Sequence, residues 1–119
     1  MIKKGTILIP ADNSGVLTIN TFHLYGGFSR KVSHFGDYVK ISIRLTKPEN
    51  PLSKKSKRKA LIIRVITNHS IIDGTYIRFN YNNAVILKKR LTTEGRELYG
   101  PIIRSFKKKK FLSSFSGIL

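Results

Sequence analysis

The segment DYVKISIRLT, residues 37–46, alternates apolar and polar side chains more regularly than any other part of the chain. Successive side chains of a β-strand point to opposite faces, so a period of two predicts a strand that is buried on one side. We expect the buried face to carry Val39, Ile41, Ile43 and Leu45, and the exposed face to carry Lys40, Ser42 and Arg44.

Shorter β-rich runs precede and follow this segment, with turn signals such as DNSG, FGD and KPENP between them. Strand signals cover Thr6–Ile9, Val16–Tyr25 and Leu98–Phe106. The runs GTYIRF and NAVIL are joined by NYNN, whose asparagines tolerate the backbone of a tight turn. Short strands at this spacing predict a mainly β protein, a small barrel or sandwich. Only the last stretch, KKKKFLSSFSGIL, is compatible with a short helix.

The run KKSKRK, residues 54–59, leads directly into a further strand, ALIIRVI. In this strand Leu61, Ile63 and Val65 are expected to face the core, while Ile62, Arg64 and Ile66 share the other face. A proline-containing turn precedes the basic run, so we interpret the run as held against the fold rather than as a flexible localisation tag. Alternation would then send Lys55, Lys57 and Lys59 to one side and Lys54 and Arg58 to the other.

The net charge of the chain indicates which class of molecule it binds. Lys and Arg total 23 against 6 Asp and Glu, a formal charge of +17, which makes a compact chain repel itself unless a polyanion supplies counter-charge. Nucleic acid is the partner that we expect. No apolar run approaches the roughly 20 residues that span a bilayer, so we expect no membrane role. The absence of cysteine excludes disulfides and thiolate zinc sites.

The cations are clustered, with 15 of the 23 in four groups. If the strands bring these groups to one face, they would form a phosphate-binding surface. A solvated loop without a partner remains the alternative for each group. The groups are Arg30 and Lys31; Lys54, Lys55, Lys57, Arg58 and Lys59; Lys88, Lys89 and Arg90; and Arg104, Lys107, Lys108, Lys109 and Lys110. Aromatic residues that lie near them or in turns, mostly interpreted as packing residues, are Phe28, Phe35, Tyr38, Tyr76, Phe79, Tyr81 and Tyr99.

The sequence contains no recognisable catalytic machinery. Its three histidines are far apart without a repeated ligand spacing, so we expect no metal. Asp12, Asp37 and Asp73 stand in DNSG, GD and DG, where a short acidic side chain shapes a turn. There is no phosphate-binding glycine loop with its lysine and no nucleophile elbow. We therefore expect a protein that is not an enzyme, with no cofactor and no small-molecule substrate.

The segment ALIIRVITNHSIIDGTYIRFNYNNAVIL, residues 60–87, resembles the signature of a known family, the universal large-subunit ribosomal protein number fourteen of bacteria and organelles. The order is a small residue, three aliphatic residues, Asp-Gly, an aromatic residue, and Asn before an aliphatic triplet. ADNSG, HFGD, KPENPL and LYGPIIR, at 11–15, 34–37, 47–52 and 98–104, are similar to the family's other landmarks in order and spacing. The resemblance extends over nearly the whole chain.

The resemblance implies a five-stranded β-barrel with a projecting hairpin and one or two short C-terminal helices. As one domain, residues 1–119 with a basic tail at 105–119, it would bind large-subunit ribosomal RNA and neighbouring large-subunit proteins. It would also contact small-subunit RNA at intersubunit bridges. The family's cations toward RNA match Arg30, Lys31, Arg64, Arg78 and Arg104. The implied intersubunit residues are Thr46, Lys47, Pro48, Glu49 and Asn50 in one loop, and Ser113, Ser114 and Phe115 near the C-terminus.

The chain departs from the family pattern near its landmarks. Asn80 and Tyr81 replace an Asp-Asp pair, which removes two negative charges beside a turn. Ser116 and Gly117 replace a Pro-Glu pair in the last expected helix.

The basic excess, the abundance of Ile, Lys and Asn, and the lack of a recognisable presequence favour a mitochondrial ribosome and a protein made inside the organelle. A ribosome in the bacterial cytoplasm is the alternative location. The alternative function is a free-standing OB-like module for single-stranded nucleic acid. Such a module should expose aromatic rings along one strand face, whereas the polar face of residues 38–45 carries Lys, Ser and Arg.

Overall fold

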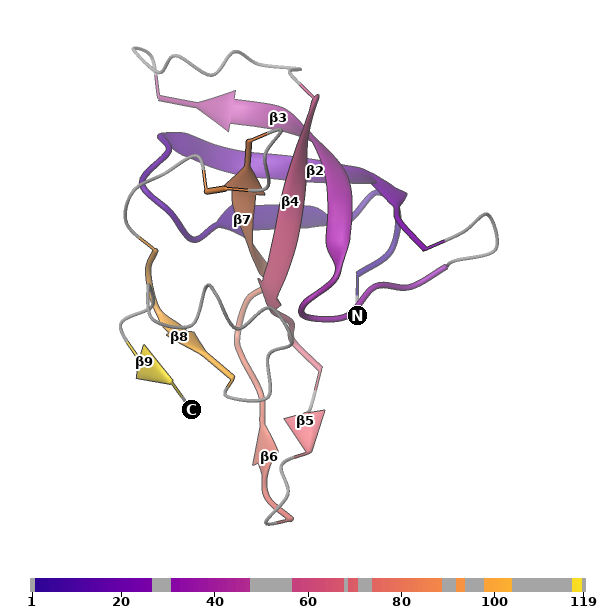
Figure 1. The fold of residues 1–119 in the computed structure, drawn as a ribbon, viewed down its shortest axis with the longest axis vertical. Helices are drawn as coiled ribbons and strands as arrows, with labels where there is room; N and C mark the ends of the chain where they lie inside the picture. Colours follow the sequence, from indigo (N-terminus) through magenta and orange to yellow (C-terminus); the bar gives the residue numbers. More distant parts are fainter. Residues whose placement is uncertain are drawn as a thin grey trace.

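The computed structural model describes residues 2–26, 31–47, 57–67, 69–70, 74–88, 92–93, 98–103 and 117–118, which are built from strands and turns (Figure 1). Within these residues no helix is long and apolar enough to cross a membrane. The strands are β1 (Ile7–Pro10), β2 (Val16–Leu24), β3 (Tyr38–Thr46), β4 (Lys57–Arg64), β5 (His69–Ser70), β6 (Tyr76–Ile77), β7 (Asn83–Leu87), β8 (Pro101–Ile102) and β9 (Gly117–Ile118).

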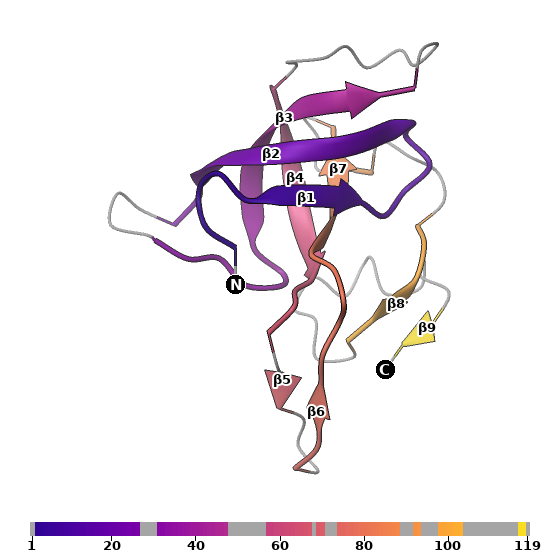
Figure 2. The ribbon, with the colours of Figure 1, turned by 180° about the vertical axis from the view of Figure 1, so that it is seen from behind.

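Five strands close into a barrel in the order β1, β2, β3, β4, β7. Neighbouring strands are antiparallel except β1 and β7, whose parallel pairing closes the barrel. Figure 2 shows β1 and β2 crossing the side of the barrel opposite to β4. The prediction of a mainly β protein with a five-stranded barrel is confirmed.

The barrel interior is filled by the alternate side chains that the sequence pattern selects. Val39, Ile41 and Ile43 of β3 are buried in one apolar cluster with residues of the other four strands, as predicted. Leu45 was expected beside them, and this expectation is wrong because its side chain is 50% exposed. Leu45 pairs with Thr18, where the register between β2 and β3 shifts on both sides, and such a bulge reorients the side chains at this end of the strand.

From Ala60 onward, strand β4 is buried on both faces rather than on one. Ala60 and Ile62 belong to the barrel interior, whereas Leu61 and Ile63 belong to a second apolar cluster outside the barrel. Leu61, Ile63 and Val65 are all buried, as predicted, but the prediction that they share one face is wrong, because Val65 lies in the interior cluster. A register shift between Ile62 and Arg64 breaks the alternation, which is why Val65 joins the interior cluster after it.

The second cluster exists because a C-terminal segment covers the outside of β4 and β7. Leu98 and Ile102 pack there with Ala11, and Phe35 and Tyr38 pack partly buried against the cluster. The Tyr99 N–H donates to the Ala11 carbonyl at 2.7 Å and ties this segment to the barrel. Of the strand expected at Leu98–Phe106, the described part forms only β8, which pairs in parallel with β9.

The hairpin of β5 and β6 projects from one end of the barrel (Figures 1 and 2). A tight turn was expected to join GTYIRF to NAVIL, but β6 pairs with β5 while β7 pairs with β4 and β1. Four of the five residues of β7 are buried, so the barrel takes up this strand, whereas Tyr76 and Arg78 stay exposed in and beside the hairpin. The stretch expected to hold a C-terminal helix, residues 107–119, lies outside the described residues except for 117–118, which form β9.

Candidate nucleic-acid interface

The outer face of β2, β3 and β4 brings lysines together across the sheet. Lys40 of β3 lies directly opposite Lys59 of β4, and Ser42 lies opposite Lys57. Both neighbours of Lys40 in β3, Val39 and Ile41, point into the barrel interior, so Lys40 and its partners face outward. Because Arg58 pairs with the inward-facing Ile41, the predicted alternation along the basic run is confirmed for residues 57–59.

Aromatic rings lie among these lysines. The Nζ of Lys59 is 4.6 Å from the centroid of the Tyr25 ring and 4.9 Å from that of Tyr38. The Nζ of Lys57 is 6.0 Å from the centroid of Phe22. These contacts hold the ammonium groups at fixed places on the surface, each with a stabilisation of about 0.5–1 kcal/mol at an exposed site. We call Lys40, Lys57 and Lys59, with Phe22, Tyr25 and Tyr38, the cationic face.

The pairing of Lys40 with Lys59 is unfavourable for the isolated protein. Like charges directly opposite each other in an antiparallel pair destabilise the sheet by roughly 0.2–1 kcal/mol. The repulsion adds to that of a chain with a formal charge of +17. A phosphate placed between the two ammonium groups would reverse the sign of this term. The cationic face is thus suited to a polyanion.

The two described turn aspartates have the structural role that the sequence predicted. The carboxylate of Asp12 accepts from the Ser14 N–H and hydroxyl and from the Ile86 N–H, which fixes the β1–β2 turn against β7. The carboxylate of Asp37 accepts from the His34 N–H at 2.8 Å. Asp73 lies outside the described residues. Across the described segments, no three His, Asp or Glu side chains gather in a way that would hold a metal ion.

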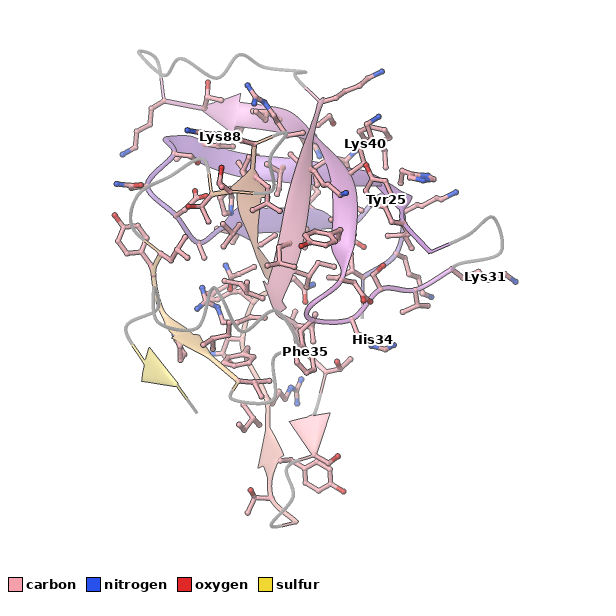
Figure 3. The ribbon with its side chains drawn as sticks, in the orientation of Figure 1. Tyr25, Lys31, His34, Phe35, Lys40 and Lys88 are labelled. Atoms are coloured by element: carbon pink, nitrogen blue, oxygen red, sulfur yellow. The ribbon has the colours of Figure 1, made fainter. Side chains whose placement is uncertain are left out.

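The predicted RNA-binding cations do not form one compact patch in the described structure. Lys31 and Lys88 are both exposed, and Figure 3 shows them on opposite sides of the molecule, with Lys40 and Tyr25 on the side of Lys31. Arg78 is exposed, and its Nε donates to the Ile66 carbonyl at 3.2 Å. Predicted RNA-binding cations outside the described residues are Arg30, Lys54, Lys55, Lys89, Arg90, Arg104, Lys107, Lys108, Lys109 and Lys110.

The expected intersubunit residues are only partly described. Thr46 ends β3, and Lys47, which follows it, is exposed and donates its N–H to the Gly15 carbonyl at 3.0 Å. The remaining residues, Pro48, Glu49, Asn50, Ser113, Ser114 and Phe115, lie outside the described structure.

Arg64 has a different environment from the other predicted cations, because it is buried with 8% exposure. Its Nε donates to the Asn83 side chain, and its Nη1 donates to the carbonyls of Tyr99 and Pro101 at 3.0 and 2.9 Å. Burial lowers the pKa of its guanidinium, although arginine stays charged near neutral pH. The position joins the end of β4 to the C-terminal segment. We therefore do not include Arg64 in the phosphate-binding surface.

Sequence reasoning missed part of the cationic face. The sequence pattern places Phe22 and Tyr25 within the expected strand Val16–Tyr25 and Lys40 on the polar face of the next strand. It does not assign these three residues to the site. The alternation of residues 38–45 already indicated that Lys40 faces outward. The contact with Lys59 depends on the register between β3 and β4, which no local pattern specifies.

Comparison with known proteins gives two further findings. The chain matches the model of a family described as ribosomal protein L14p/L23e over residues 1–117. It is also 44% identical over 117 residues to the large ribosomal subunit protein uL14m of Tetrahymena pyriformis, a match that covers 98% of each chain.

Proposed function

The chain belongs to the ribosomal protein L14p/L23e family, a structural component of the large ribosomal subunit rather than an enzyme, and we propose that it binds large-subunit ribosomal RNA through its cationic face. The single observation that carries this proposal is the pairing of Lys40 with Lys59 beside the half-buried rings of Tyr25 and Tyr38. The two ammonium groups repel each other in the free protein, and RNA phosphates would neutralise both.

The lysines act mainly on phosphates in this proposal. Phosphate contacts fix the position and orientation of a protein on RNA without reading its sequence, which suits a structural component. Tyr25 and Tyr38 hold the Lys59 ammonium between them, so little side-chain entropy is lost when a phosphate binds. Lys31, Arg78 and Lys88, which are exposed elsewhere on the surface, extend the contact to further RNA segments.

The end of β3 is proposed to face the small subunit. Thr46 and Lys47 lead into the loop that the family resemblance assigns to an intersubunit bridge. Two prolines, Pro48 and Pro51, restrict this loop, so ordering it on contact costs little entropy. Replacing Thr46–Asn50 by a Gly/Ser loop should weaken subunit joining while large subunits still incorporate the protein. Unchanged joining at limiting magnesium would exclude this role.

A mitochondrial ribosome is the proposed location. The support is the relative uL14m, whose final letter denotes the mitochondrial type of this protein, together with the matched length of the two chains. The further proposal that the protein is made inside the organelle rests on the basic excess and on the Ile-, Lys- and Asn-rich composition.

Sedimentation of the tagged protein through sucrose gradients tests the proposal. The protein should migrate with large subunits and resist a moderate salt wash, because many phosphate contacts act together. A matched variant with Lys40, Lys57 and Lys59 changed to Gln should be released at lower salt. Recovery of the parent protein in the low-mass fractions would instead favour a free-standing nucleic-acid-binding module.

A further inference from the structure

A cavity of about 350 Å³ lies at the end of β4, apart from the cationic face. It is bounded by the segment between β6 and β7 on one side and by the start of β8 on the other. Its size lies at the lower end of the roughly 300–1,000 Å³ typical of ligand pockets, which suits one small flat group. The lining residues are Arg64, Phe79, Asn80, Tyr81, Asn83, Gly100 and Pro101.

Arg64 offers this cavity hydrogen-bond donors. A guanidinium has five N–H donors, and the three contacts to Asn83, Tyr99 and Pro101 use the donor of Nε and those of Nη1. Within the described part of the chain, the two donors of Nη2 remain for a ligand. All three acceptors are neutral. The Arg64 side chain is more than nine-tenths buried, yet none of these three partners is a carboxylate that would balance its charge. An acceptor that enters the cavity would therefore be bound strongly.

The other walls favour a flat aromatic ligand over a bare anion. Phe79 and Tyr81 contribute rings, and the Tyr81 side chain is 63% exposed, so one face of its ring is open for stacking. Most of the cavity lining is apolar. A carboxylate or phosphate would lose its hydration against such walls, whereas a nucleobase would bury its apolar faces and keep a polar edge for Arg64.

Gly100 allows the backbone at the edge of the cavity to approach the Arg64 guanidinium closely. Its φ of +80° is one that L side chains rarely adopt, and a Cβ at this position would collide with the Nη1 of Arg64. The close approach of the backbone lets the Tyr99 and Pro101 carbonyls hold the guanidinium from one side. The donors of Arg64 are thereby oriented before a ligand arrives.

We propose that this cavity binds one unpaired guanine of the RNA, with Nη2 of Arg64 donating to the adjacent O6 and N7 acceptors and the ring of Tyr81 stacked on the base. Arginine to guanine O6 and N7 is the commonest specific contact between proteins and bases. This inference rests on the proposed RNA binding and adds to it a base-specific contact. The phosphates bind at the cationic face, and the cavity selects which nucleotide is extruded.

Two RNA pentamers, UUGUU and UUAUU, test the proposal with the full-length protein. Both purines stack, but adenine presents an amino donor where guanine presents O6. Titrations at low salt should show UUGUU binding at least about five-fold more tightly, the lower end of the discrimination expected from an arginine–guanine contact. The parallel loss of affinity for both pentamers with added salt reports the phosphate contacts of the proposed function.

Tyr81→Ala supplies the matched variant, because the exposed ring can be removed without opening the core. It should lower the affinity for UUGUU by about five-fold or more, from the loss of stacking. Tyr76→Ala removes a ring that is 70% exposed on the hairpin and should leave the affinity unchanged. Arg64→Lys should abolish the preference for UUGUU, provided that circular dichroism shows that the variant folds. The test with Tyr81→Ala holds even if the Arg64→Lys variant does not fold.

Three results would overturn the proposal. Equal affinity of the parent for both pentamers, with salt-dependent binding retained, would remove the guanine contact and leave the proposed function standing. Loss of all RNA binding would remove both. Binding of a short acidic peptide that depends on Tyr81, while Tyr81→Ala leaves RNA binding unchanged, would assign the cavity to a protein ligand instead.

Discussion

The two halves of β4 present their outward side chains to different surroundings. Lys57 and Lys59 in the first half lie in the cationic face beside aromatic rings. Leu61 and Ile63 in the second half have the same parity, but the C-terminal segment covers them and they are fully buried. One side of one strand thus passes from the cationic face to a second core of the protein itself.

The difference shows that alternation decides only which side of the sheet a residue takes. Whether that side is exposed depends on which later segment packs over it. Leu98 and Ile102 cover the second half of β4, and the Tyr99–Ala11 hydrogen bond holds them there. Over the first half, the side chains beside the lysines include Phe22 of β2, Tyr25 just after it and Tyr38 of β3, and Lys59 is also paired with Leu87 of β7.

The largest expected effect tests the covered half. Ile63→Ala should lower the free energy of unfolding by about 2–5 kcal/mol, because it removes buried methyl groups and leaves a cavity in the second cluster. Urea denaturation followed by circular dichroism measures this loss. The control Ile7→Ala, at a side chain that is 50% exposed on β1, should change stability far less. Equal losses in the two variants would mean that the C-terminal segment does not cover β4 in solution.

The sequence predicted the barrel well because its strongest signals are local. The alternation in residues 38–45 correctly placed Val39, Ile41 and Ile43 in the interior. It failed for Leu45, where a register shift reorients the strand end. In β4 the sequence correctly predicted that Leu61 is buried, but not that it lies in a second cluster with Leu98 and Ile102. A local sequence pattern shows neither where a bulge lies nor which distant segment will cover a strand.

For the site, the sequence predicted which basic residues are clustered along the chain, but not how they are arranged in space. The basic run correctly indicated outward lysines for its described members Lys57 and Lys59, and the resemblance supplied the family. The partners of Lys59 are Tyr38 and Lys40 of β3 and Tyr25 just after β2, and these contacts depend on register. No sequence signal revealed the carbonyls that surround Arg64, so its burial could not be predicted.

A smaller effect is expected at the exposed half. The double variant Lys57→Gln and Lys59→Gln should flatten the plot of log affinity against log salt by roughly 0.7–0.9 for each phosphate that the protein no longer neutralises. Each cation–π contact that the variant loses should cost about 0.5–1 kcal/mol of stability, so circular dichroism must show that the variant remains folded. The titration uses the cognate large-subunit RNA fragment, with Lys3→Gln as a control at an exposed lysine outside the cationic clusters. A slope equal to that of the parent would make the first half of β4 a solvated surface.

The smallest expected effect is a gain in the stability of the free protein, and this gain distinguishes the first half of β4 from the covered second half. Lys40→Gln should raise the stability of the free protein at low salt by about 0.2–1 kcal/mol, because it removes the repulsion from Lys59 across the ladder. In the Lys59→Gln background the same change should give no gain, so a double-mutant cycle isolates the pair. Screening by salt should erase the gain in the single variant.

The same substitution should weaken RNA binding, since the phosphate that both ammonium groups share would lose one partner. A residue that stabilises the complex while destabilising the free protein is expected at a binding surface and not in a core, where Ile63→Ala can only destabilise. If Lys40→Gln lowered the stability of the free protein and left RNA affinity unchanged, Lys40 would be a structural residue. The first half of β4 would then resemble the second, and the distinction between a partner surface and a covered core would fail.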